Sequence, residues 1–281
     1  MTANSEYPQR IVCLTEETTE TLYLLGEERR IVGISGFTVR PPRARREKPR
    51  VSAFTSARTA RIVALAPDLV LGFSDLQADI AAELIRRNVA VHAFNQRDIA
   101  GILDMIRTLG ALVGVAGKAD ALAQTLERRL AQARARAAML ERRPRVYFEE
   151  WDEPMISGIR WVAELIEIAG GEDVFPALSR RKNAKDRIVS ADELIAAKPD
   201  IIVGSWCGKK FVPAKVAARP GFADVPAVRD NFVREIKSPL ILQPGPAALT
   251  DGLDALAAII EEWAATQPAH VEGARSSTRG G

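Results

Sequence analysis

The chain contains 281 residues, of which 47% are apolar and 27% are charged. This composition is typical of a globular protein, and the length suits one large domain or two lobes. Basic residues number 39 and acidic residues 36, which leaves a net charge of +3. Because no basic stripe is interleaved with aromatic residues, we expect no nucleic-acid partner.

Two cysteines are too few for the disulfide framework of a small secreted domain, although one bridge between Cys13 and Cys207 stays open. No apolar run approaches the roughly 20 residues that cross a bilayer. The first residues, MTANSEYPQR, are polar where a signal peptide has its apolar core. From the sequence as it stands we expect a cytoplasmic protein, with a periplasmic location as the alternative if the N-terminus was trimmed.

Strands and helices alternate along the first part of the chain. A predicted strand at 11–14 is followed by a helix that stops at Gly26 and by the strand IVGIS at 31–35. VALAPDLVLG, at 63–72, gives a helix end and another strand, and a helix, a strand and a helix follow up to residue 113. Such alternation predicts a parallel sheet covered by helices on both faces.

Residues 117–143 consist almost entirely of helix formers, enough for about seven helical turns. A helix of that length suits a spine between two lobes. Pro144 ends it, and a second series of strands and helices begins with RVYFEE and runs to about Trp263.

The sequence therefore predicts an α/β fold: two Rossmann-like lobes with mainly parallel sheets, joined by a single long spine helix. The expected parts are an N-terminal lobe at 1–113, the spine at 114–143, a C-terminal lobe at 144–268 and a disordered tail at 269–281.

The two halves of the chain also resemble each other. VALAPDLVLG at 63–72 aligns without a gap with IAAKPDIIVG at 195–204, and both combine a helix end, Pro-Asp, three apolar residues and Gly. RIVCL likewise aligns with RVYFE, and ETLYLLG with ELIEIAG. These matches predict two lobes that are built alike.

Ligands of a parallel α/β sheet bind beyond the carboxyl ends of its strands. Four loops occupy such positions: TEETTE after Leu14, GFSDLQ after Leu71, EEWDEP after Phe148 and GSWCGKK after Val203. If the lobes face each other across the spine, all four loops border one cleft.

Cys207 is a weak candidate for a catalytic nucleophile, because a thiol of this kind needs a nearby base. The only histidines are His92, inside a predicted strand, and His270, in the predicted tail. The same scarcity excludes a histidine-rich zinc site, and we expect no metal site of the protein's own. Cys207 is expected to pack at the lip of the cleft, with thiolate ligation of a metal centre in the bound molecule as the alternative.

Trp151 and Trp206 follow two predicted strands, where a large ring finds little core and can stack on a flat ligand. Four carboxylates surround the first of them and are expected to be mostly solvated: Glu149, Glu150, Asp152 and Glu153. The arginine-rich stretch TVRPPRARREKPR at 38–50 is expected to be a solvated loop, with contact to an anionic ligand group as the alternative.

Five features match one known class: RIVCLTEETTETLYLLG, APDLVLG, the single spine helix, ISGIRWVAELIEIAGGEDVF and KPDIIVGSW. Together they resemble the cobalamin-type substrate-binding proteins of ABC importers, over about Pro8 to Trp263. The resemblance implies a rigid two-lobed clamp that holds a large ligand in the inter-lobe cleft, with aromatic side chains packed on the macrocycle. Relatives of this architecture also bind ferric siderophores and haem.

Seven residues form the expected ligand-binding set: Glu16, Phe37, Phe54, Trp151, Trp206, Cys207 and Lys209. The resemblance places both tryptophans at cleft positions and makes the phenylalanines partners from the first lobe. We expect each tryptophan ring to be exposed in the empty protein, so that replacement by alanine weakens binding more than folding.

The resemblance also implies an acidic docking residue on each lobe, which meets arginines of a permease. Asp75 or Asp79 fills this role in the first lobe, whereas the second lobe has Lys209 and Lys210 in the corresponding region.

The expected function is non-enzymatic binding of a corrinoid such as cobalamin by a monomer that requires no cofactor. The alternative within the class is a ferric siderophore or haem. The alternative outside it is a cytosolic enzyme or chaperone acting on a cobalt or tetrapyrrole precursor, using Cys207 and the acidic loop at 149–153. A lowered pKa of the Cys207 thiol, beside Lys209 and Lys210, would indicate the latter.

Overall fold

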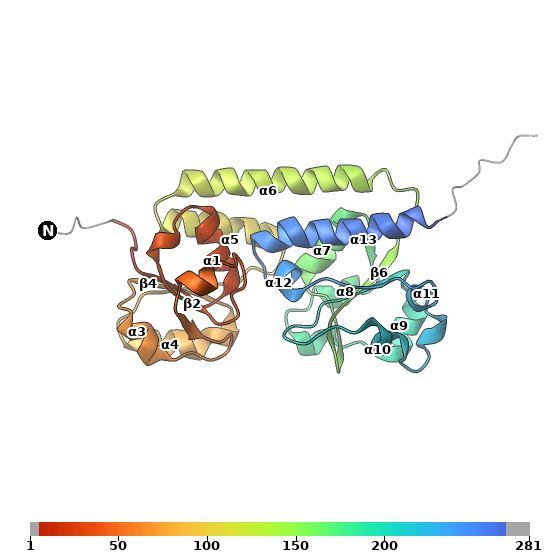
Figure 1. Ribbon diagram of the computed structural model, residues 1–281, viewed down its shortest axis with the longest axis horizontal. Helices are drawn as coiled ribbons and strands as arrows, with labels where there is room; N and C mark the ends of the chain where they lie inside the picture. Colours follow the sequence, from red (N-terminus) through yellow and green to blue (C-terminus); the bar gives the residue numbers. More distant parts are fainter. Residues whose placement is uncertain (1–5, 268–281) are drawn as a thin grey trace, which may run out of the picture.

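The computed structural model describes residues 6–267. Two lobes lie side by side beneath the long helix α6 (Ala116–Ala137), which spans both (Figure 1). Each lobe contains a five-stranded sheet, so the predicted α/β fold with two lobes is confirmed. The tail predicted at 269–281 lies outside the described residues, and so does His270.

The N-terminal lobe is built on a fully parallel sheet of order β3-β2-β1-β4-β5. Its strands are β1 (Ile11–Cys13), β2 (Ile31–Ser35), β3 (Arg50–Ser52), β4 (Leu69–Phe73) and β5 (Val91–Phe94). The central strand β1 is completely buried, as expected for a strand that helices cover on both faces. The helical segments of this lobe are α1 (Glu16–Leu24), η1 (Glu28–Arg30), α2 (Ala44–Glu47), α3 (Thr59–Ala64), η2 (Asp75–Gln77), α4 (Ala78–Arg86) and α5 (Ile99–Leu112).

The C-terminal lobe has a mainly parallel sheet of order β10-β9-β6-β7, and β8 also pairs with β6. Only the β6–β7 pair is antiparallel among the pairs of the described strands. The strands are β6 (Arg145–Asp152), β7 (Met155–Ser157), β8 (Glu172–Asp173), β9 (Ile201–Gly204) and β10 (Val233–Glu235).

Short helices surround this second sheet, and its longest helices, α7 and α13, lie on the side of the spine (Figure 1). The helical segments are α7 (Arg160–Ala169), α8 (Pro176–Ser179), η3 (Ala184–Arg187), α9 (Ala191–Ala197), α10 (Pro213–Ala217), η4 (Phe222–Asp224), α11 (Pro226–Arg229), α12 (Ser238–Ile241), the π-helix η5 (Ala248–Gly252) and α13 (Leu253–Ala265).

Helix α6 packs on α5 of the first lobe and on α7 of the second. Its buried residues recur every three or four positions and form one stripe: Ala119, Ala123, Leu126, Leu130 and Ala133. A Cβ atom at Gly110 of α5 would lie 2.1 Å from the Cβ of Ala119. The two helices therefore approach too closely for any side chain at Gly110, and their contact fixes the spine to the first lobe.

The spine is shorter than the predicted 117–143, because α6 ends at Ala137. Beyond it Arg142 forms an ion pair with Asp200 at 2.8 Å, and Arg143 pairs with Glu167. Both arginines reach acidic residues of the second lobe that a continued helix would not place within reach. Tertiary contacts thus override the helix propensity of these residues.

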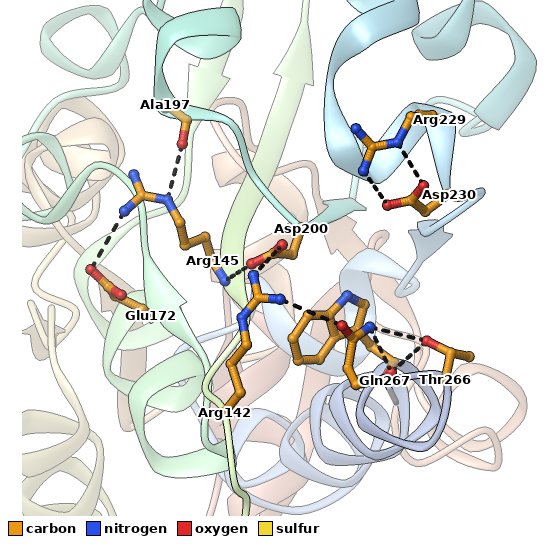
Figure 2. A network of polar contacts seen from close by, with 10 residues as sticks. Arg142, Arg145, Glu172, Ala197, Asp200, Arg229, Asp230, Thr266 and Gln267 are labelled. Carbon is orange, nitrogen blue, oxygen red and sulfur yellow. Dashed lines mark hydrogen bonds and ion pairs between the residues drawn. The ribbon is translucent and has the colours of Figure 1, made fainter. Parts of the chain in front are cut away.

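An arginine and an aspartate fasten the first strand of the second lobe to its neighbour (Figure 2). The backbone N–H of Arg145 donates to Oδ2 of Asp200 at 2.8 Å, and the N–H of Asp200 donates to the carbonyl of Arg145 at 2.8 Å. Nε of Arg145 also donates to the carbonyl of Ala197, the last residue of α9, at 3.0 Å. One residue pair thereby ties β6 to the turn that opens β9.

The first lobe repeats this arrangement with Arg10 and Asp68. The N–H of Arg10 donates to Oδ1 of Asp68 at 2.9 Å, and the N–H of Asp68 donates to the carbonyl of Arg10 at 2.9 Å. Nε of Arg10 donates to the carbonyl of Leu65, the counterpart of Ala197, at 3.1 Å. Ala66 and its counterpart Lys198 both have φ of 46°. The predicted similarity of the two lobes therefore extends to backbone conformation and hydrogen bonding.

Both cysteines are free, Cys13 being buried and Cys207 exposed. The disulfide that the sequence left open is therefore not formed. Within residues 6–267, no helix combines the length and the apolar character needed to span a bilayer.

Candidate functional site

The carboxyl edge of the first sheet faces the second lobe. Nε2 of Gln96, just after β5, donates to the carbonyl of Pro244 at 2.9 Å. Asp75, after β4, lies 3.8 Å from Nζ of Lys182 in the second lobe. Because loops at the carboxyl ends of strands form the ligand sites of such sheets, the space between the lobes is the candidate site.

On the second lobe, three of the predicted residues come together. Nζ of Lys209 lies 5.4 Å from the ring centroid of Trp151 and 5.2 Å from that of Trp206. The same ammonium group forms an ion pair of 2.6 Å with Asp152. Asp152 thus holds the ammonium group of Lys209 over the two indole rings, and these residues form a lip at the ends of β6 and β9.

Trp206 does not present its ring to the cleft, and the expectation that it would is wrong. The residue is only 3% exposed and belongs to the core of the second lobe. Its ring meets Phe211 edge to face at 4.8 Å, and its Nε1 donates to Oε1 of Glu149 at 3.0 Å. The phenyl ring of Phe211 occupies the place that a Cβ of Gly204 would take, so the segment after β9 folds back over the sheet and covers the indole.

Three of the four carboxylates around Trp151 are paired, contrary to the expectation that most are solvated. Glu149 is fully buried and binds both terminal nitrogens of Arg219, at 2.6 and 2.9 Å. Glu150 receives two bonds from the buried Arg187, and Asp152 pairs with Lys209. Strand β6 continues to Asp152, through residues that were expected to form a loop after Phe148.

Trp151 itself is half-buried, and its Nε1 donates to the carbonyl of Glu153 at 3.0 Å. The indole N–H is therefore already bonded, and the ring remains the part available to a ligand. Cys207 is exposed close by. Although the residue is exposed as a whole, partial burial of its sulfur, followed by repulsion from Glu150, raises the pKa of Cys207, the opposite of the lowered pKa that an enzyme using this thiol requires.

The first lobe contributes residues of two kinds. Phe37 is 60% exposed on the loop after β2, whereas Phe54 is half-buried against the core and its carbonyl accepts a bond of 2.8 Å from Gln77. Glu16 is buried, and its Oε2 accepts the N–H of Val39 at 3.1 Å. Phe37 is the most exposed of these three residues, and Glu16 holds the loop that carries it.

His92 lies on the edge strand β5 and is half-buried, with its ring 4.3 Å from that of Phe94. Burial lowers its pKa. Among residues 6–267, no group of three or more histidine, cysteine or acidic side chains is arranged to hold a metal ion.

Three glutamates at the start of α1 are buried where the lobes meet: Glu16, Glu17 and Glu20. Glu20 accepts hydrogen bonds from Arg40 and from the N–H of Ala247. Glu17 packs so closely on Gly245 that a Cβ atom added to this glycine would lie 2.5 Å from the Cβ of Glu17. Burial, the main cause in both, raises the pKa of Glu16 to about 8 and that of Glu17 to about 7.

These pKa values predict a pH-dependent stability. The folded state holds the protons of Glu16 and Glu17 more tightly than the unfolded chain, in which the pKa is near 4.5. Stability should therefore fall as the pH rises from about 4.5 to about 8, by up to about 1.4 kcal/mol per pH unit and group. Glu17→Gln should remove its share, so that the mutant gains stability over wild type at pH 8 but not at pH 5 in urea titrations. Equal slopes for the mutant, wild type and the exposed control Glu261→Gln would contradict the assignment.

Sequence reasoning missed a cluster at the carboxyl edge of the first sheet. Arg97, three residues after β5, stacks its guanidinium on Phe73 at 5.0 Å and lies 3.7 Å from Asp75. The rule that singled out the other loops also applies to the end of β5, and it would have found Arg97. The buried Arg187 carried no such signal, because it follows no strand.

A groove of about 470 Å³ lies between α7 and α8, where it is lined in part by Arg160, Glu164, Asp173 and Arg180. None of the seven predicted ligand-binding residues lines it.

Comparison with known proteins assigns the family. A family model described as periplasmic binding protein matches residues 11–240. The chain belongs to this family. It is a substrate-binding protein of the ABC-transporter type, and such proteins bind small-molecule ligands and interact with ABC permeases.

Relatives of this substrate-binding protein differ in their named ligands. A cobalamin-binding protein of Halobacterium salinarum is 27% identical over 252 residues, 88% of this chain and 68% of the relative. The vitamin B12-binding protein BtuF of Vibrio cholerae superposes with a TM-score of 0.74 at 21% identity, over 92% of this chain and 99% of that one. The haem-binding protein RhuT of Roseiflexus superposes with a TM-score of 0.77 at 23% identity, over 90% and 99%. At these identities the superpositions show a shared fold.

The cytoplasmic location expected from the polar first residues is wrong. The family is one of periplasmic binding proteins, and both BtuF and RhuT are named as periplasmic. The comparisons therefore point to a location outside the cytoplasm, and they indicate a solute binder instead of an enzyme.

Proposed function

We propose that this protein binds a corrinoid of the cobalamin type between its lobes. The observation that carries the proposal is the lip at the ends of β6 and β9, where Trp151 lies beside Lys209 and the exposed Cys207. The names of the Halobacterium and Vibrio proteins support a corrinoid as the ligand. The N-terminal lobe at 1–113 and the C-terminal lobe at 144–268 would each supply one face of the site.

Two aromatic rings would contact the macrocycle of the ligand. The Trp151 ring has its N–H already bonded and is half-buried, so stacking costs it little conformational freedom. Phe37, 60% exposed on the opposite lobe, loses unfavourable contact with water when a flat ligand covers it. Trp206 would act from beneath, by supporting Lys209.

Titration with cyanocobalamin, followed by calorimetry and by quenching of tryptophan fluorescence, tests the proposal. We expect saturable binding to one site per chain. Absence of heat and of quenching at high micromolar ligand would contradict it.

Trp151→Ala should raise the dissociation constant for cyanocobalamin at least tenfold, because loss of an aromatic anchor commonly costs about 2 kcal/mol. The midpoint of thermal unfolding should stay within a few degrees of wild type, since the ring is only half-buried. Trp151→Phe is the control and should keep most of the affinity. A strongly lowered midpoint together with unchanged affinity would make Trp151 a core residue.

A ferric siderophore or haem is the second candidate, supported by the name of RhuT and by the arginines of the 38–50 stretch. Two arginines of that stretch already form ion pairs within the protein: Arg40 pairs with Glu20 and Asp251, and Arg43 pairs with Glu28. Haem binding that weakens steeply with salt and exceeds cyanocobalamin binding would favour this candidate.

For permease docking we propose Asp79 as the acidic residue of the first lobe. It is exposed at the start of α4, whereas Asp75 lies within 4 Å of Arg97 and Lys182. Asp79→Ala should leave ligand affinity unchanged and reduce ligand-stimulated ATP hydrolysis by the cognate permease.

A further inference from the structure

We propose that Arg97 and Lys182, which approach each other from opposite lobes, form a subsite for an anionic group of the ligand in the inter-lobe cleft. The inference rests on the proposed function and deepens it, because it specifies a ligand that carries a phosphate or carboxylate.

The first support is the unused hydrogen-bonding capacity of Arg97. Its side chain is only 24% exposed, yet among residues 6–267 its one hydrogen bond runs from Nε to Oδ1 of Asn95, at 3.1 Å. The four N–H groups on its terminal nitrogens have no hydrogen-bond partner in the described chain. The guanidinium lies over the ring of Phe73, 5.0 Å from its centroid, and this contact helps to hold the donors in position.

The second support is an excess of positive charge. Arg97 and Lys182 lie 3.7 and 3.8 Å from the same oxygen of Asp75. Both distances are long for an ion pair, and one carboxylate serves two cations from opposite lobes. An anion placed between the two cations would balance the remaining charge and would accept short, charge-assisted hydrogen bonds.

The third support comes from the residues behind the pair. Arg187 is buried, and its own charge is balanced by two bonds to Glu150. The pKa of Arg97 is lowered, first by burial and then by repulsion from Arg187, against the opposing effect of Asp75. The charged form of Arg97 is thus less favoured in the empty protein than in water, and a bound anion would reverse that effect.

The chemistry of corrinoids offers a direct test. Cyanocobalamin carries a phosphodiester in its nucleotide loop, whereas dicyanocobinamide has the same corrin ring but lacks the whole nucleotide loop, phosphate included. Arg97→Gln should raise the dissociation constant of cyanocobalamin about tenfold and leave that of dicyanocobinamide within twofold. Arg97→Lys should restore part of the affinity, and Arg180→Gln, which removes an exposed charge from the neighbouring segment, should change neither.

Equal losses for the two corrinoids, or no loss for either, would overturn the subsite while leaving corrinoid binding in place. If wild type binds neither corrinoid, the proposed function fails. The subsite is then tested with haem, whose propionates carry the same kind of charge. Weaker haem binding by Arg97→Gln with unchanged thermal unfolding would then support it, and unchanged or absent haem binding would overturn it.

Discussion

Replacing Trp206 by alanine is expected to lower the free energy of unfolding by about 3–5 kcal/mol. The ring is 3% exposed, packs edge to face on Phe211, and donates its N–H to the buried carboxylate of Glu149. Truncation leaves a cavity in the core of the second lobe and removes one bond from a group that water cannot reach. Urea denaturation followed by circular dichroism measures the loss.

Trp151→Ala is the matched control, since it removes the same side chain from the same lip at a half-buried position. Its loss of stability should be much smaller than that of Trp206→Ala. If instead Trp206→Ala unfolds within about 1 kcal/mol of wild type and binds ligand much more weakly, the ring is a ligand contact and its placement in the core is wrong.

Glu149→Gln is expected to destabilise the protein by a similar amount, about 3–5 kcal/mol, because it leaves a partly buried arginine without its counter-charge. Glu149 is the partner of both terminal nitrogens of Arg219 and of the Trp206 indole. Thermal and urea unfolding should both shift, while the far-ultraviolet circular dichroism of the folded state should not change.

Two further variants separate the buried pair from ordinary surface charge. Asp152→Asn breaks the pair with the more exposed Lys209 and should cost no more than about 1 kcal/mol. Adding Arg219→Met to Glu149→Gln should recover part of the loss, because no unpaired charge is then left. A loss for Glu149→Gln no greater than that for Asp152→Asn would contradict a structural role of this pair.

Four strands of the first lobe could be predicted from sequence because they are short, largely apolar runs, whereas β3 was missed because Arg50 belongs to the arginine-rich stretch that was expected to be a loop. IVGIS, for example, coincides with β2. The antiparallel strand β7 was missed, since its three residues, Met155–Ser157, have no alternation to identify them. The end of α6 was also placed too late, because the contacts of Arg142 and Arg143 with the second lobe, and not local propensity, determine it.

The sequence correctly indicated that Trp151, Trp206 and Lys209 lie together, because loops after parallel strands converge at one edge of a sheet; their role as ligand contacts stays a prediction. The sequence did not predict how exposed these side chains are. Whether a tryptophan after a strand faces the cleft or the core depends on the path of the next few residues. Here Phe211 closes over Gly204 and draws Trp206 inward, a long-range effect that composition and spacing do not reveal.

Hydrogen exchange with and without saturating cyanocobalamin tests most directly whether a corrinoid binds between the lobes. We expect slower exchange in four segments that border the inter-lobe space, at residues 36–39, 95–97, 151–153 and 205–209, and no change in the groove between α7 and α8. Protection confined to that groove, or no protection at all under conditions that saturate binding, would contradict the proposed site.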